Sequence, residues 1–271
     1  MTVLLHISDT HFGTEQAPVV EALLRTAHQQ RPGLVVLSGD ITQRARRRQF
    51  ESARRFVERL GAVPTLVVPG NHDIALLNLA ARVFAPYAGY MKAFGKELEP
   101  VLESPHWLVI GLNTTRAYRH KHGELSPDQV IRTAERLRRA TPAQLRILIV
   151  HHPVVVTLRE DHRNRLRMDA DTIARWSEAG ADLVLGGHIH LPYVAALHER
   201  ISGLARPMWA VQAGTAISRR VRPGVPNSVN LIRWGDPLPA GQCVVERWDY
   251  SRGTDSFAKA SETVLHTGGA K

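Results

Sequence analysis

Residues that commonly bind metal ions follow five short apolar runs in this chain, and this arrangement constrains the fold more than any other feature. Each run has the length and composition of a buried strand. We therefore expect loops that leave the ends of strands and converge at one edge of a sheet. The runs and the polar residues after them are 3–7 with Asp9 and His11, 34–37 with Asp40, 66–68 with Asn71 and His72, 147–150 with His151 and His152, and 183–185 with His188 and His190.

The first part of the chain alternates strand and helix patterns. Val19, Leu23 and Ala27 have helical spacing between the first two runs, and Phe50 with Ala53 has the same spacing before the third. This order favours a parallel sheet whose loops meet at the carboxyl edge. We expect a further strand at 107–111 and a helix from Ser126 and Pro127 to about residue 139. The run 147–150 is expected to return to the same sheet.

The pattern changes after His190. Segments 193–197, 208–212, 228–234 and 243–250 are strand-like and are separated by Gly and Pro, which predicts a second, more antiparallel sheet. The segment 74–94 has a helical pattern that Pro86 should interrupt. The predicted fold class is therefore α/β, a four-layer αββα sandwich of two mixed sheets flanked by helices. We predict one domain over residues 1–250, followed by a mobile tail, 251–271, that is rich in Ser, Gly, Thr and Ala.

Length and composition agree with a single large domain. The chain has 271 residues and is 44% hydrophobic, enough for one sizeable core. Cys243 is the only cysteine, so neither an intrachain disulfide nor a thiolate metal cage is available. No apolar run approaches the roughly 20 residues of a membrane helix, and the first residues lack the basic start of a signal peptide. We expect a cytoplasmic protein without a membrane span.

The chemistry of the polar clusters indicates a hydrolytic metal site. Carboxylate, amide and imidazole ligands without cysteine suit Mn, Fe or Zn, and the sequence does not choose among them. Each residue alone has an ordinary structural interpretation: Asp9 and Asp40 as turn or cap residues, His11 as a core imidazole, and Asn71 as a turn former. All five clusters in order at strand ends are much harder to explain in that way.

The five clusters together resemble the calcineurin-like metallophosphoesterase superfamily over about residues 2–234. In the residues and spacing of their motifs they are most similar to the branch of class III cyclic-nucleotide and glycerophosphodiester phosphodiesterases. The motifs that carry the resemblance are Asp9-x-His11, Gly39-Asp40, Gly70-Asn71-His72-Asp73, His151-His152-Pro153 and Gly187-His188-Ile189-His190.

The resemblance implies a site for two divalent or mixed-valence metal ions and assigns its ligands. One ion would be held by Asp9, His11 and His190, the other by Asn71, His151 and His188, and Asp40 would bridge them. A bridging carboxylate and a bridging hydroxide offset the repulsion between two close cations, and that hydroxide would be the nucleophile. His72 would protonate the leaving group as the general acid, and Asp73 would orient it. Asp73 has an alternative as a helix cap.

The substrate is less constrained than the chemistry. The branch implies a small diester, such as a cyclic nucleotide or a glycerophosphodiester, and some of its members form homo-oligomers. We expect Arg44 or Arg219 to bind substrate phosphate before the other arginines near the site. His152 follows the ligand His151, and a substrate contact and a purely structural role both stay open.

Three other functions remain as alternatives. The net charge of +10 and the arginines of one helix, among them Arg46, Arg47 and Arg54, encourage a nuclease. Only 6% of the residues are aromatic, which argues against a base-stacking surface. The apolar segment 74–94 would suit a lid over a lipid-linked phosphoester. A scaffold that had lost catalysis is disfavoured by the intact ligand set.

Overall fold

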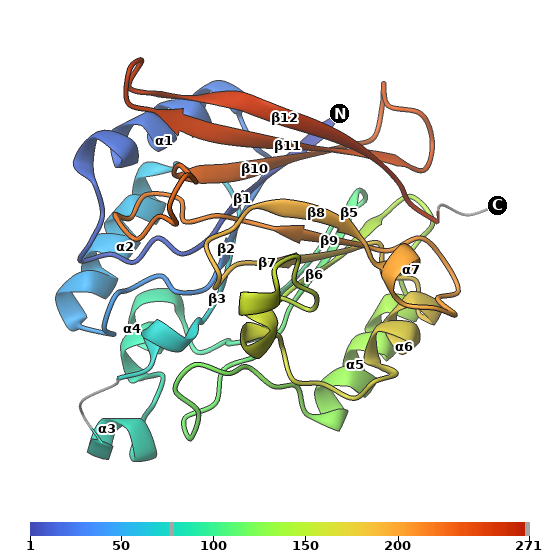
Figure 1. Ribbon diagram of the computed structural model, residues 1–271, viewed down its shortest axis with the longest axis horizontal. Coiled ribbons are helices and arrows are strands. Elements are labelled where there is room, and N and C mark those ends of the chain that lie inside the picture. The colour runs from blue at the N-terminus through green and yellow to red at the C-terminus, as the bar shows by residue number, and fades with distance from the viewer. Residues whose placement is uncertain (76–78, 269–271) are drawn as a thin grey trace.

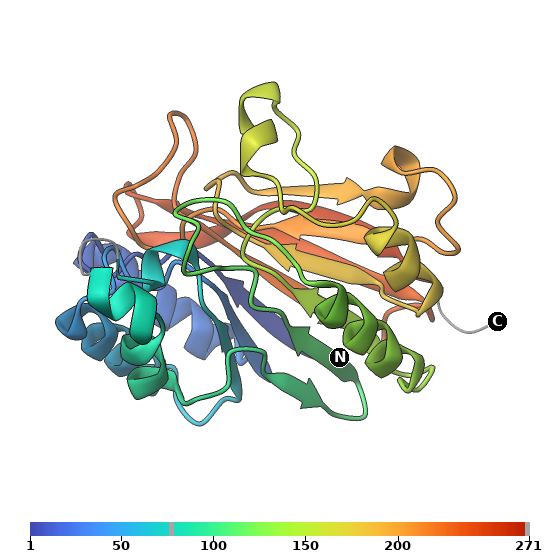
Figure 2. The same ribbon diagram turned by 90° about the horizontal axis from the view of Figure 1, so that it is seen from below.

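The computed structural model describes residues 1–75 and 79–268. Its strands form two six-stranded sheets that stack on each other, with helices on their outer faces (Figures 1 and 2). Both sheets contain parallel and antiparallel pairs. The predicted four-layer αββα sandwich is therefore confirmed.

The first sheet has the strand order β12-β11-β10-β1-β2-β3. Its strands are β1 (Thr2–Ile7), β2 (Leu34–Ser38), β3 (Thr65–Val68), β10 (Ser228–Trp234), β11 (Gln242–Ser251) and β12 (Ser256–His266). The pairs among β1, β2 and β3 are parallel, and the others are antiparallel. The crossover helices are α1 (Ala17–Gln30) and α2 (Arg47–Arg59).

The second sheet has the order β4-β5-β6-β7-β9-β8. Its strands are β4 (Val101–Glu103), β5 (Trp107–Gly111), β6 (Leu145–Ile149), β7 (Leu183–Gly186), β8 (Tyr193–Ala196) and β9 (Trp209–Gln212). The inner strands β5, β6, β7 and β9 are parallel, and the edge strands β4 and β8 are antiparallel to them. The remaining helices are η1 (Asn71–Asp73), α3 (Leu79–Phe84), α4 (Ala88–Phe94), α5 (Pro127–Arg138), η2 (Arg159–Asn164), α6 (Thr172–Glu178) and α7 (Leu197–Arg200).

The core consists of three apolar layers, and the alternation of side chains along the strands explains them. On β1, Leu5 and Ile7 pack with α1 and α2, whereas Leu4 points to the other sheet. The second sheet packs on α5 and α6 through residues such as Leu148 and Trp176. Because inner strands such as β1 and β6 are buried on both faces, their sequences are almost continuously apolar.

The distribution of strands between the sheets differs from the prediction. The run 147–150 does not return to the first sheet; β6 and β7 belong to the second, together with β5. The strands after His190 do not form a sheet of their own, since β8 and β9 extend the second sheet and β10 to β12 extend the first. The metal-ligand loops therefore leave two facing sheets, not one. A buried strand has the same kind of apolar pattern in either sheet, so the sequence could not show to which sheet each strand belongs.

The predicted tail is wrong for most of its length. Strand β12 pairs with β11 over ten residue pairs, and Phe257 and Leu265 are buried. Residues 269–271 lie outside the described residues. The prediction failed because β12 is an edge strand with one exposed face, so its Ser, Thr, Lys and Glu residues resemble a solvated segment.

The segment 74–94 is divided where Pro86 predicts an interruption. Helix α3 ends at Phe84 and α4 begins at Ala88, and part of this segment, residues 76–78, lies outside the described residues. Tyr90 of α4 is buried, and its hydroxyl donates to the carbonyl oxygen of Val67. None of the described helices has both the length and the apolar content that crossing a membrane requires.

Candidate metal centre

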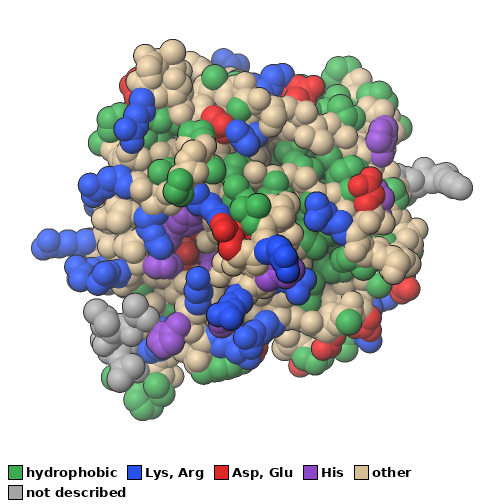
Figure 3. Space-filling view, viewed as in Figure 1, with side chains coloured by type: hydrophobic (Ala, Val, Ile, Leu, Met, Phe, Trp, Pro, Cys, Tyr) green, Lys and Arg blue, Asp and Glu red, His purple; other side chains and the backbone are tan. Residues whose placement is uncertain are grey.

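A cavity of about 740 Å³ opens where the carboxyl ends of the two sheets meet. Figure 3 shows Lys and Arg side chains gathered around a hollow in which His and acidic side chains are visible. Asp9, His11 and His151 are fully buried at this point. The cavity is lined by side chains that include Asp40, Arg44, Asn71, His72, His188, His190 and Arg220.

The loops that carry the site hold an unusual backbone conformation. Five of the eight non-glycine residues with positive φ in the described part of the chain are Asp9, His11, Asp40, His188 and His190. Such residues cost of order 1–3 kcal/mol each and persist only where the surrounding structure fixes them. Their concentration among the sequence-predicted ligands indicates that the loops are shaped for function.

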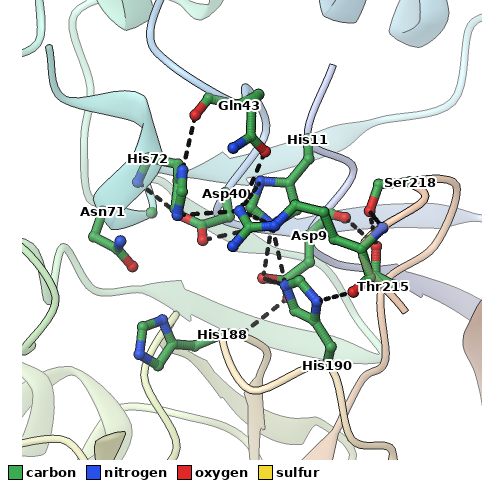
Figure 4. Close-up of polar contacts among 12 residues, drawn as sticks. Asp9, His11, Asp40, Gln43, Asn71, His72, His188, His190, Thr215 and Ser218 are labelled. Atoms are coloured by element: carbon green, nitrogen blue, oxygen red, sulfur yellow. Dashed lines mark hydrogen bonds and ion pairs between the residues drawn. The ribbon is translucent and has the colours of Figure 1, made fainter. Parts of the chain in front are cut away.

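The first predicted ligand set, Asp9, His11 and His190, lies together. The Oδ1 atom of Asp9 is 3.2 Å from Nε2 of His190 and 3.7 Å from Nε2 of His11. The two Nε2 atoms are 3.0 Å apart (Figure 4). Hydrogen bonds fix the second polar atom of two of these side chains. His190 donates through Nδ1 to the carbonyl oxygen of Arg220, and the Ser8 hydroxyl donates to Oδ2 of Asp9. One oxygen and two nitrogens are thus directed at a common point.

In the second predicted set, Asn71, His151 and His188, the His151 ring contacts Asn71, and its centroid lies 5.1 Å from that of the His188 ring. His151 donates through Nδ1 to the carbonyl oxygen of Ser38, so its Nε2 faces Oδ1 of Asn71 at 3.3 Å. Both ring nitrogens of His188 are buried without a hydrogen-bond partner in the described structure. An unpaired buried imidazole is costly, and a cation at this point would give one of the two nitrogens a partner.

Asp40 lies between the two sets. Its Oδ1 atom is 3.2 Å from Nε2 of His151, and its Oδ2 atom is 3.8 Å from Nε2 of His11. The backbone N–H of His72 donates to Oδ1 at 2.8 Å and fixes the carboxylate. Each oxygen therefore faces a ligand of a different set, as a bridging carboxylate requires.

Burial and the neighbouring carboxylates shift the pKa values of His11 and His151 in opposite directions. Burial lowers the pKa of His11 to about 3, despite the nearby Asp40 and Asp9 carboxylates, so the ring is a neutral ligand at ordinary pH. For His151, burial lowers the pKa, but the attraction of Asp40 outweighs it and raises the pKa to about 9. The proton on Nε2 of His151 then occupies the side of the ring that faces Asp40. A metal ion binding there would displace that proton.

His72 faces the cavity, but Asp73 does not touch its ring. His72 donates through Nδ1 to the carbonyl oxygen of Gln43 at 2.8 Å, which leaves Nε2 toward the cavity. The Asp73 carboxylate is buried and accepts hydrogen bonds from the backbone N–H groups of Ile41, Thr42 and Gly70. Burial, reinforced by the charge of Asp40, raises the pKa of Asp73 to about 6. Gln43, not Asp73, therefore orients His72, and Asp73 joins the loops after β2 and β3.

His152 does not reach the cavity. It is fully buried, and its ring nitrogens contact the Thr114 hydroxyl at 2.8 Å and the carbonyl oxygen of Lys121 at 3.1 Å. Its ring centroid is 4.5 Å from that of His188. These contacts correspond to the structural alternative for His152, whose ring packs against that of His188.

Among the arginines, the structure brings Arg44, Arg220 and Arg222 to the cavity, and Arg222 is already paired with Asp161 and Glu160. Arg219 does not line it, and its neighbour Arg220 takes the place expected for it. The Nη1 atom of Arg220 lies 3.2 Å from Nε2 of His72, 3.1 Å from Oε1 of Gln43 and 3.3 Å from Nδ1 of His11. Which of two adjacent arginines faces a site depends on the loop conformation, and the sequence carries no signal for it.

Comparison with known proteins gives a consistent result. The family model described as calcineurin-like phosphoesterase matches residues 2–192. A probable cyclic nucleotide phosphodiesterase of Synechococcus sp. is 28% identical over 194 residues, covering 67% of each chain. The glycerophosphodiester phosphodiesterase GpdQ of Enterobacter lignolyticus is 38% identical over 86 residues, which are 26% of this chain and 29% of that protein.

Two solved structures share the fold at low sequence identity. The chain superimposes on a purple acid phosphatase, PPD1, of yellow lupin with a TM-score of 0.71 and 10% identity, covering 98% of this chain and 53% of that one. It superimposes on a dimetal phosphatase of Danio rerio with a TM-score of 0.63 and 11% identity, covering 98% and 99%. The chain thus spans about half the length of the lupin protein.

Proposed function

The chain belongs to the calcineurin-like phosphoesterase family, and from this premise we propose that it is a phosphodiesterase that uses two metal ions to hydrolyse small diesters. The resemblance of its motifs to this family, predicted from the sequence, is confirmed by the family match. Cyclic nucleotides and glycerophosphodiesters are the substrate classes we favour. The names of the Synechococcus and Enterobacter relatives support both.

The observation that carries the proposal is the position of Asp40. Its two oxygens face Nε2 of His151 and Nε2 of His11, which belong to the two separate ligand sets. A site for a single cation needs no carboxylate between two groups of imidazoles. Two neighbouring cations require one, because their mutual repulsion must be offset.

The residues present fit two metal ions. The unpartnered nitrogens of buried His188 and the converging atoms of Asp9, His11 and His190 supply nitrogen and oxygen ligands. Bound there, two cations would neutralise charge on the phosphoryl oxygens and acidify the attacking water. Nitrogen and oxygen ligands suit Mn, Fe or Zn, and availability decides among these metals.

The side chains around the ligands would bind substrate and move a proton. Arg220 and Arg44 border the cavity, and their guanidinium groups are suited to nonbridging phosphate oxygens. His72 presents Nε2 to the cavity, where a proton carried on this atom would reach the leaving oxygen. The contact between Arg220 and His72 would give way to the substrate phosphate between them.

The size of the cavity supports a small substrate. Its volume of about 740 Å³ lies within the range of roughly 300–1,000 Å³ typical of small-molecule sites. A phospholipid diester would extend beyond it. We also expect the enzyme to work in a reducing compartment such as the cytoplasm, because its one cysteine, Cys243, is buried and free.

The experiment compares phosphoesters on metal-stripped protein reloaded with Mn, Zn or Fe. Bis(4-nitrophenyl) phosphate, cyclic AMP, a glycerophosphodiester, a phospholipid diester in detergent and 4-nitrophenyl phosphate are assayed side by side. The proposal expects turnover of the small diesters only after reloading, with higher kcat/KM than for the monoester. Metal-independent turnover, or a clear preference for the monoester or the lipid, would contradict it.

A further inference from the structure

A second hollow, of about 490 Å³, is formed by two segments that also contribute to the wall of the metal cavity. Its wall is markedly basic, and none of the described residues that line it carries a carboxylate. The residues that form it belong to the loop before α5 and to the segment around η2. They are His122, His162, Arg163, Arg165 and Arg167, with Leu166 and Met168.

The two hollows are formed by neighbouring residues of the same two segments. Lys121 and Asn164 line the metal cavity, whereas His122 and Arg163 line the second hollow. Backbone hydrogen bonds fix these segments to each other, since the N–H of Arg167 donates to the carbonyl oxygen of Gly123 at 2.9 Å. The basic hollow therefore lies along the same two segments that carry Lys121 and Asn164 to the metal cavity.

The arginines of this hollow have unused hydrogen-bond donors. Arg163, Arg165 and Arg167 are exposed, and within residues 1–75 and 79–268 their side chains have no ion pair or hydrogen bond. Nearby Arg222 differs, because it pairs with Asp161 at 2.7 Å and also with Glu160. The Nδ1 atom of His122 is buried without a partner. Like charges held together without a carboxylate favour an anionic ligand.

We propose that this hollow binds a second phosphate group of the substrate, so that the preferred diester is a nucleotide carrying a phosphate beyond the one that is cleaved. The inference rests on the proposed function, because the scissile phosphate must sit at the metal centre. Guanidinium groups bind phosphate through paired, charge-assisted hydrogen bonds, and three of them border the hollow. Such a phosphate occurs both in a short oligonucleotide and in a bisphosphorylated nucleoside.

The test compares two chromogenic esters that differ by one phosphate. They are thymidine 5′-(4-nitrophenyl phosphate) and the same compound with a 3′-phosphate. With the Mn-loaded enzyme at low salt, we expect kcat/KM to be about tenfold or more higher for the ester with the second phosphate, which corresponds to about 1.4 kcal/mol. The advantage should shrink as salt rises.

Two triple variants that each remove three positive charges test whether the kcat/KM advantage of the second phosphate comes from this hollow. In Arg163→Gln/Arg165→Gln/Arg167→Gln, the advantage should fall to near one, while kcat/KM for the simpler ester stays the same. The control, Arg136→Gln/Arg138→Gln/Arg139→Gln, removes three exposed arginines at the end of α5 and should keep the advantage. Arg163→Gln and Arg165→Gln alone should each lose part of it, which guards against misfolding of the triple variant.

Inhibition distinguishes the two sources of the phosphate. A tetrathymidylate that inhibits far better than thymidine 3′,5′-bisphosphate would identify an oligonucleotide substrate, and equal inhibition would identify a bisphosphorylated nucleoside. Equal kcat/KM for the two esters in the wild type would overturn this inference and leave the proposed function standing. The same holds if the advantage survives in the triple variant, or if it disappears equally in the control. Failure to hydrolyse either ester would overturn the proposed function with it.

Discussion

Nε2 of His72 lies 3.2 Å from Nη1 of Arg220 at the opening of the metal cavity. The two residues come from distant parts of the chain, His72 from the loop after β3 and Arg220 from the loop between β9 and β10. Nδ1 of His72 is already used by the Gln43 carbonyl oxygen. Of the two ring nitrogens, Nε2 is therefore the one on the side of the cavity, and it is the atom to which we assign the proposed proton transfer.

Replacement of His72 should affect poor leaving groups most. We expect His72→Ala to lower kcat for an alkyl diester by about 10²–10⁴-fold, the usual contribution of a general acid. The loss for a nitrophenyl diester should be much smaller, because nitrophenolate leaves without a proton. Steady-state kinetics on both esters measures the difference, and metal content should match the wild type. Equal losses on both esters would argue against the acid role.

Asp73 is expected to contribute to stability and not to proton transfer. Its carboxylate accepts from Ile41, Thr42 and Gly70, so an amide would place its own N–H groups against donors. We expect Asp73→Asn to reduce the free energy of unfolding by about 1–3 kcal/mol for each donor left without an acceptor. Urea unfolding measures this. A variant with wild-type stability and a changed leaving-group dependence would restore the role predicted from sequence.

The metal ligands were more predictable from the sequence than the residues that surround them. Asp9, Asp40 and His188 follow strand ends, and strand ends are visible in the sequence as apolar runs before Gly, Asp or His. The roles of Arg220, Asp73 and His152 depend on which way a side chain leaves an irregular loop. That direction is set by contacts between residues far apart in the chain, such as the contact of His152 with the carbonyl oxygen of Lys121, about thirty positions away. A local sequence pattern carries no information about such contacts.

Adjacent residues of β12 test whether the C-terminal segment is part of the core. Leu265 is fully buried, and Val264 is 47% exposed. Leu265→Ala should cost about 2–5 kcal/mol of unfolding free energy through the lost apolar contacts and the cavity left behind. Val264→Ala should cost no more than about 0.5 kcal/mol. Near-equal, small effects in thermal and urea unfolding would mean that residues 256–266 are a tail after all.

Acid should destabilise the metal-free protein partly through His6. Burial lowers the pKa of this residue to about 3, and its Nε2 contacts the Ser38 hydroxyl at 2.8 Å. Below about pH 6.5, the usual pKa of histidine, the unfolded chain binds a proton that the folded chain does not. The stability from neutral His6 is thus present above pH 6.5 and is lost as the pH falls toward 3.

A single substitution isolates this contribution. His6→Gln should make the pH dependence of the unfolding free energy shallower by up to about 1.4 kcal/mol per pH unit between pH 6 and 4. Urea unfolding of both proteins in chelator measures the two slopes. Parallel curves would show that His6 takes up its proton equally in the folded and unfolded states.

The fold class was predictable because buried strands and amphipathic helices have distinct periods. The assignment of strands to sheets was not, since Leu4 on β1 and Ile147 on β6 occupy equivalent positions facing the same inner layer. The two strands have the same kind of apolar pattern, and they belong to different sheets only because the chain passes from the first sheet to the second after β3. The error did not affect the site, because both sheets direct their carboxyl ends to it.

The measurement that bears most directly on the metal centre is the number of metal ions bound per chain in the wild type and in Asp40→Asn. The amide keeps the shape of Asp40 and an acceptor for the His72 N–H, but it removes the charge shared between the two ligand sets. We predict two ions per wild-type chain after dialysis against Mn, and loss of both ions and of diesterase activity in the variant. A variant that retains two ions, or a wild type that is active with one, would contradict the account.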